Sequence, residues 1–210
     1  PLRPGVASDP KRTFDGLFGV FNDSLPDGWG LLLLDRLLRR SGLPLERITP
    51  LSRLSLVGSG GMGALEYEPV TPDPDPLPER IDLDGVAEEA WRTLNEDPLP
   101  VETLRTLMAL NGSSCGARPK IMVRVSGDRR LIVPDAVAEP GCDPWLIKFP
   151  ARHDDPAIGR MEYACSLAAK RAGIEMPETA LFPGIAHAFD DGVQFPSCLL
   201  YTSDAADDKA

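Results

Sequence analysis

The sequence predicts an α+β fold with mostly antiparallel sheets. Two stretches between residues 24 and 57 carry apolar residues at helical spacing. A strand–turn–strand pattern at 120–134 predicts a β-hairpin. A proline-rich segment at 71–80 lies between these two regions and indicates a joint between substructures.

The first half is expected to contain two strands and two helices. In chain order, the expected ranges are a strand at 17–23, a helix at 24–42, a helix at 50–57 and a strand at 64–70. Ser24 is a suitable cap for the longer helix, and Pro26 suits its first turn, where a missing N–H costs nothing. Gly42 is expected to end this helix, and Thr49 to cap the next one.

The segment at 71–80 carries four prolines and alternating acids. Proline has no backbone N–H to donate, so the segment forms neither a helix nor a central strand. We expect a connector or an exposed edge loop between two subdomains. The predicted division is residues 1–75, residues 76–196 and a tail at 197–210.

The second half is expected to begin with helices and continue with strands. In chain order, the expected elements are a helix capped by Asp84, a helix at 101–110, strands at 120–125, 131–134 and 144–150, a helix at 155–174 and a strand at 178–184. One side of the helix at 155–174 is lined by Met161, Cys165, Leu167, Ala168 and Ala172. Gly173 is expected to end this helix.

Composition excludes several classes of function. The 210 residues carry a formal net charge of −10, whereas a protein that grips nucleic-acid phosphates normally presents a basic face. No apolar run approaches the ~20 residues of a membrane-spanning helix, and the start of the chain lacks a signal-peptide core.

Metal and disulfide scaffolds are not expected either. The four cysteines form no CxxC pair, and neither His153 nor His187 stands beside a convincing ligand set. Reduced cysteines fit a cytoplasmic protein.

The stretch GSSCGARPK at 112–120 is the first candidate binding site. Successive backbone N–H groups of small residues form concave anion sites, and basic side chains add positive charge. The candidate residues are Gly112, Ser113, Ser114, Gly116, Ala117, Arg118 and Lys120. The stretch lacks the GxxxxGK[ST] pattern of P-loop proteins and the full GxGxxG of protein kinases. A plain helix-to-strand turn therefore stays an open alternative.

Lys148, in the apolar stretch PWLIKFP, is the second candidate. A buried ammonium is costly without an anionic partner, and Glu162 on the following helix could supply one. Kinase-like folds use such a pair, in which the strand lysine contacts the α and β phosphates and the helix glutamate holds that lysine. The alternatives are a Lys148 that faces solvent and a Glu162 that is an ordinary surface acid.

The order of these features is typical of a kinase N-lobe. A loop of small residues leads into a strand and a hairpin. A strand with an embedded lysine, a helix with a glutamate and a further strand follow. Taken together, this order favours nucleotide binding over the plain turn, the solvent-facing lysine and the surface acid that each feature would allow by itself.

The same stretches resemble the HipA family of serine/threonine kinase toxins. They are FGVFNDSLPDGWGLLLLDRLL, GSGGMGALEYEP, GSSCGARPK, WLIKFP and RMEYACSLAAKRAGI, in this order from about Gly16 to Pro183. The resemblance implies a HipA-type N-terminal subdomain at 1–75, joined to a kinase-like N-lobe with an antiparallel sheet at 76–196. It also implies the toxin half of a type II toxin–antitoxin pair, located in the cytoplasm.

The resemblance implies roles for individual residues. The loop from Ser113 to Lys120 would bind the ATP phosphates, and Ser113 would be its self-phosphorylation site, with Ser114 as the neighbouring alternative. Lys148 would coordinate ATP, with Glu162 as its partner. The implied cofactors are ATP and Mg²⁺, and the implied partner is a HipB-type helix-turn-helix antitoxin. The implied substrates are aminoacyl-tRNA synthetases, whose phosphorylation slows translation and promotes persistence.

The resemblance also implies parts that lie elsewhere. The catalytic aspartate and the magnesium ligands of the family belong to a helical C-lobe that would follow residue 210, so no catalytic residue and little or no kinase activity are expected in this chain. Residues 197–210 fit no expected element and resemble an artificial extension. The competing interpretations are a non-catalytic module that contacts an antitoxin or a separate kinase lobe, and a phosphotransferase that acts on small molecules.

Overall fold

The computed structural model describes residue 14 and residues 16–58, 61, 65–68, 77–112, 116–155 and 157–182, together with the backbone of 198–202. The helices of this part are α1 (Gly19–Asn22), α2 (Gly28–Arg40), η1 (Leu45–Arg47, a 3-10 turn), α3 (Pro50–Val57), α4 (Leu83–Leu94), α5 (Val101–Asn111) and α6 (Ile158–Arg171). None of them is long and apolar enough to cross a membrane.

The strands form one antiparallel sheet. They are β1 (Lys120–Ser126), β2 (Ile132–Pro134), β3 (Cys142–Lys148), β4 (Thr179–Phe182) and β5 (Cys198–Thr202), in the spatial order β2-β1-β3-β5-β4. Every neighbouring pair runs antiparallel. The predicted α+β class with an antiparallel sheet is therefore confirmed.

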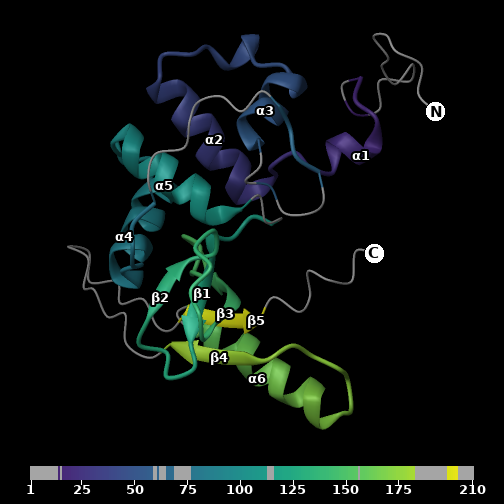
Figure 1. Cartoon of the computed structure of the whole chain (residues 1–210), viewed down its shortest axis with the longest axis vertical. Coiled ribbons are helices and arrows are strands. Elements are labelled where there is room, and N and C mark those ends of the chain that lie inside the picture. The colour runs from purple at the N-terminus through teal and green to yellow at the C-terminus, as the bar shows by residue number, and fades with distance from the viewer. Residues whose placement is uncertain are drawn as a thin grey trace.

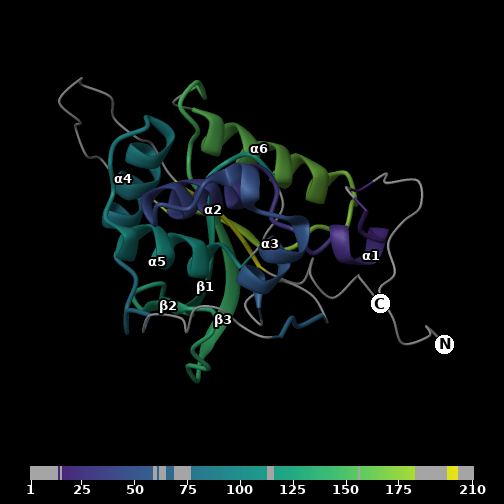
Figure 2. The ribbon, with the colours of Figure 1, turned by 90° about the horizontal axis from the view of Figure 1, so that it is seen from above.

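The helices lie on different sides of this sheet. Figure 1 shows α2, α3, α4 and α5 grouped together, with α6 at the opposite end of the molecule and the sheet between them. Figure 2, seen from above, shows α2 and α5 running side by side. The loop before β1 lies beside the start of α2, because Trp29 N donates to Gly116 O at 2.9 Å.

A single apolar core joins α2, α4 and α5 to the sheet. Alternate residues of β1 enter it, since successive side chains of a strand point to opposite faces. The buried members include Trp29, Leu33, Val86, Ala90, Leu104, Leu107, Leu110, Ile121, Val123, Val125, Trp145 and Ile147. Residues on both sides of the proline-rich segment thus share one core, while the predicted boundaries at 75 and 196 stay predictions.

The helices of the second half and the hairpin begin and end close to the predicted positions. Helices α5 and α6 and strands β1, β2, β3 and β4 all coincide with predicted elements. The predicted cap of α3 is also confirmed, because Thr49 Oγ1 accepts a hydrogen bond from Ser52 N at 3.1 Å.

Two predicted strands of the first half are wrong where the structure describes them. Within 17–23, Gly19–Asn22 form the short helix α1, and Leu17 makes only an isolated bridge to Phe14. Residues 65–68 are not part of a strand. A short apolar run does not distinguish helix from strand by periodicity alone, so the tertiary setting decides. The proline-rich residues 71–76 lie outside the described part of the chain.

Two predicted caps are displaced by a few residues. Helix α2 begins after Asp27 and not after Ser24, so Pro26 precedes the helix. Helix α4 is capped by Asp82, whose side chain accepts from Asp84 N at 3.2 Å, so Asp84 lies inside the first turn. Each of these stretches offers two acceptable cap residues, and local preference does not choose between them.

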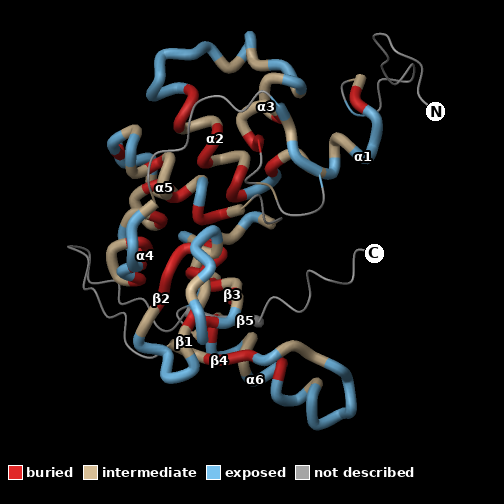
Figure 3. Tube along the Cα trace, in the orientation of Figure 1, coloured by how far each residue is buried: buried red, intermediate tan, exposed pale blue. Residues whose placement is uncertain are grey.

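The apolar side of α6 is exposed. Only Gly159 and Ser166 of this helix are buried, and Met161 is 55% exposed. Figure 3 shows the contrast between the exposed α6 and the buried segments of α2, α5 and β1. Helix α6 meets the sheet through a polar contact, in which the hydroxyls of Ser166 and Thr179 lie 2.7 Å apart.

The tail at 197–210 contributes a strand. The backbone of Cys198–Thr202 forms β5, which pairs with β3 on one side and β4 on the other. The expectation that this stretch fits no element is therefore wrong for these five residues. A non-native origin of the tail stays a prediction.

Candidate functional site

Two lysines lie opposite each other where β1 begins and β3 ends. The strand register pairs Lys120 with Lys148, and the neighbouring pair is Ile121 with Ile147. Residues directly opposite in an antiparallel pair share a face of the sheet. The two isoleucines enter the core, so the two lysines occupy the other face. Lys120 is only 4% exposed, whereas the Lys148 side chain is 29% exposed.

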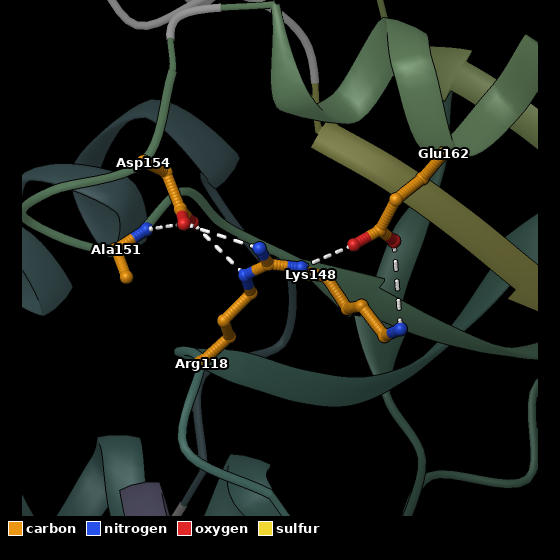
Figure 4. Close-up of polar contacts among 5 residues, drawn as sticks. All are labelled: Arg118, Lys148, Ala151, Asp154 and Glu162. Carbon is orange, nitrogen blue, oxygen red and sulfur yellow. Dashed lines mark hydrogen bonds and ion pairs between the residues drawn. The ribbon is translucent and has the colours of Figure 1, made fainter.

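Glu162 of α6 reaches the second lysine. Its Oε2 lies 3.6 Å from Lys148 Nζ, across the face of the sheet that α6 covers. This is the strand-lysine and helix-glutamate geometry that the sequence predicted. Figure 4 shows both side chains directed toward each other.

Glu162 has a second cationic partner. Its Oε1 accepts from Arg118 Nη1. The same guanidinium binds Asp154 twice, with Nη2 3.1 Å from Oδ1 and Nε 2.9 Å from Oδ2. Arg118 therefore lies between two carboxylates, as Figure 4 shows. The hydrogen bond to Asp154, followed by the charges of Asp154 and Glu162, raises the pKa of Arg118 above its ordinary value, so the guanidinium stays charged.

This network changes the role expected of Arg118. The sequence predicted a basic side chain that adds positive charge to the 112–120 loop. In the structure its charge is matched by two acids, and its planar fork ties the loop to α6 and to the segment before α6.

Asp154 was missed by the sequence prediction. Its Oδ2 also accepts from Ala151 N at 2.8 Å, which folds the chain between β3 and α6. Its neighbour Asp155 accepts from Ala157 N at 2.7 Å near the start of α6. Adjacent acids before a helix signal a cap, but no side chain caps α6, whose N-cap residue is Ala157. The sequence does not show that Asp154 binds Arg118 instead.

Gly116 is the described centre of the candidate loop. Its N–H donates to Asp27 Oδ1 at 2.9 Å, and its carbonyl accepts from Trp29 N at 2.9 Å. Its φ of 110° suits glycine. A Cβ at this position would lie 2.6 Å from Lys120 Nζ, so the absence of a side chain leaves space for that ammonium.

For the remaining candidate residues of the loop the structure gives little or no detail. Ala117 is exposed beside Gly116. Ser113 and Ser114 lie outside the described residues, so the structure says nothing about the predicted self-phosphorylation site. Among the described residues, no three His, Cys, Asp or Glu side chains are placed to hold a metal ion.

The structure therefore brings together Gly116, Lys120, Lys148 and Glu162, on an antiparallel sheet with helices on both sides. Fold and site define an α+β protein with a basic cluster beside a glycine turn.

Comparison with known protein families narrows this class. Residues 112–189 match the HipA-like C-terminal domain, and residues 1–68 match the HipA N-terminal domain. Together the two matches cover more than half of the chain. The chain belongs to the HipA family. No curated protein and no solved structure matches it.

Proposed function

We propose that this chain supplies the nucleotide-binding part of a HipA-type serine/threonine protein kinase toxin. The reaction would move the γ-phosphate of ATP to a serine or threonine of a protein substrate. The family resemblance points to an aminoacyl-tRNA synthetase as that substrate, with slowed translation and persistence as the outcome. It points to a HipB-type antitoxin as the partner.

The observation that carries the proposal is the pairing of Lys120 with Lys148. Like charges directly opposite on one face of a sheet destabilise it. Lys120 is only 4% exposed, and its ammonium lies beside Gly116. A nucleotide phosphate carries the negative charge that such a pair favours. Glu162 reaches this pair through Lys148 and also binds Arg118.

The residues have separate tasks in this proposal. Lys148 would contact the α and β phosphates, and Glu162 would hold Lys148 in place. Lys120 and the backbone at 116–117 would line the phosphate side of the site. Magnesium accompanies ATP in kinases, but the described residues offer no three-carboxylate group for it. The family resemblance assigns its ligands to the kinase C-lobe.

Ser113 is the proposed self-phosphorylation site. A phosphate there adds about −1.5 to −2 charge where the nucleotide phosphates would bind. We expect a Ser113→Asp variant to bind ATP more weakly than the unsubstituted chain in a calorimetric titration. Unchanged affinity would contradict this role, and Ser113→Ala, which removes the hydroxyl without adding charge, is the matched control.

The nucleotide site is tested by Lys148→Gln, which removes the charge and keeps most of the side-chain volume. Loss of a charge-assisted contact to phosphate is expected to weaken ATP binding by about tenfold or more. Lys170→Gln, at the exposed end of α6, removes the same charge outside the site and should bind ATP normally. Equal affinities of the two variants in a calorimetric titration would refute the assignment.

A further inference from the structure

Asp27 holds an unusual position at the start of α2. It is the N-cap residue of this helix, where an aspartate normally accepts a hydrogen bond from an N–H of the first turn. Its side chain makes no such bond within α2. Its Oδ1 accepts instead from Gly116 N at 2.9 Å, across 89 positions of sequence.

The same turn also binds the other polar group of Gly116. Trp29 N is one of the first-turn donors that have no partner inside a helix. It donates to Gly116 O at 2.9 Å. Gly28, between these two residues, allows the close approach, because a Cβ there would lie 2.5 Å from Gly116 O. We call Asp27, Gly28 and Trp29 the clamp.

The clamp acts on the part of the loop that adjoins Lys120. Lys120 Nζ lies beside the Cα of Gly116, where a Cβ would be only 2.6 Å away. A change in the backbone angles of Gly116 would therefore change the space open to that ammonium. Two hydrogen bonds from the start of α2 oppose such a change, one to the N–H of Gly116 and one to its carbonyl.

We propose that Asp27 and Trp29 are positioning residues of the nucleotide site. They fix the backbone on both sides of the Gly116 Cα, and through it the place of the Lys120 ammonium. This inference rests on the proposed nucleotide binding. It goes beyond that proposal by making the region matched to the HipA N-terminal domain a working part of the site.

The Asp27 side chain acts here as an acceptor and not as a charge. A carboxylate near a phosphate site opposes anion binding, so its value must come from orienting Gly116. Asp27→Asn keeps an acceptor oxygen of similar reach and removes the charge. Asp27→Ala removes both, which separates orientation from electrostatics.

The test measures two quantities on the 210-residue chain. Amide hydrogen exchange at Gly116 reports the clamp, and a calorimetric titration with ATP reports the site. We expect Asp27→Ala to speed exchange at Gly116 at least about threefold and to raise the Kd for ATP about three- to tenfold, as loss of one hydrogen bond predicts. Asp27→Asn should stay within about twofold of the unsubstituted chain in both.

A structural control separates positioning from general destabilisation. Thr49→Ala removes the cap of α3, which lies in the same half of the chain, and costs stability of the size expected for a helix cap. It should change neither Gly116 exchange nor ATP affinity. The clamp is overturned if Asp27→Ala and Thr49→Ala give the same Gly116 exchange rate and ATP affinity. It is also overturned if Asp27→Asn binds ATP as weakly as Asp27→Ala.

The two proposals fail in different ways. An unsubstituted chain that binds no ATP refutes the proposed function. In that case exchange at Gly116 still decides the clamp, because faster exchange in Asp27→Ala alone supports it and unchanged exchange overturns it. ATP binding that is present but insensitive to Asp27→Ala leaves the nucleotide site standing and overturns the positioning role.

Discussion

Helices α5 and α6 are of similar length but meet the rest of the molecule in different ways. Leu104, Leu107 and Leu110 of α5 are all buried in the core. Helix α6 buries only Gly159 and Ser166, and it presents Glu162 to the lysine face of the sheet. The first helix thus contributes mainly to stability, whereas the second is held by polar contacts beside the candidate site.

The largest expected effect tests this division directly. Leu107→Ala should lower the free energy of unfolding by about 2–5 kcal/mol, because Leu107 is 1% exposed and its truncation leaves a cavity. Leu167→Ala on α6, where the side chain is 37% exposed, should cost about 0.5 kcal/mol or less. Urea unfolding measures both. Similar losses would show that α6 contributes to the core after all.

A smaller effect is expected at the polar contact of α6 with β4. Ser166 Oγ donates to Tyr163 O at 2.7 Å, so its single hydrogen is used and the Thr179 hydroxyl must donate to it. Ser166→Ala leaves Thr179 without this buried partner and should cost about 1–2 kcal/mol in urea unfolding.

The matched control for this contact is Ser55→Ala in α3. Ser55 Oγ also donates to a carbonyl three residues earlier, Ser52 O at 2.9 Å. Ser55→Ala should lower the free energy of unfolding by less than Ser166→Ala does. Adding Thr179→Val should recover part of the Ser166→Ala loss, because no unpaired hydroxyl then remains. Strict additivity of the two changes would argue against the contact.

The smallest effect concerns Cys142 on the sheet and Cys165 on α6, the two cysteines whose side chains the structure describes. Burial, the largest cause, raises the pKa of the Cys142 thiol above its ordinary value, so less thiolate is present at any given pH. Cys165 is exposed on α6. Iodoacetamide at pH 8 should therefore alkylate Cys165 at least about tenfold faster, since the thiolate is the reactive form.

Peptide mapping by mass spectrometry measures the two rates separately. Because the pKa of Cys142 is raised, its labelling rate should increase at higher pH values than the labelling rate of an ordinary thiol does. Equal rates at pH 8 would mean that the Cys142 thiol is as accessible to the reagent as the Cys165 thiol, which would contradict its burial.

The site was predictable in part from sequence. Lys148 and Glu162 were paired by the order of strand and helix, and the structure brings them to 3.6 Å. The pairing of Arg118 with Asp154 and Glu162 was not predictable, because these residues are 36 and 44 positions apart and no local pattern links them. The bond between Asp27 and Gly116 spans 89 positions and leaves no sequence signal except a polar turn before a helix.

The sequence by itself determined the elements whose signals are local. The apolar spacing of α2 and α5 and the Thr49 cap follow from neighbouring residues, and the structure has them. The same holds for β1, where alternate residues, Ile121, Val123 and Val125, enter the core. The tertiary structure alone decided which side of α6 is covered, whether 17–23 becomes helix or strand, and which acids bind Arg118. These outcomes depend on what each segment meets in space, and burial and charge pairing between distant residues outweigh the weak local preferences of short segments.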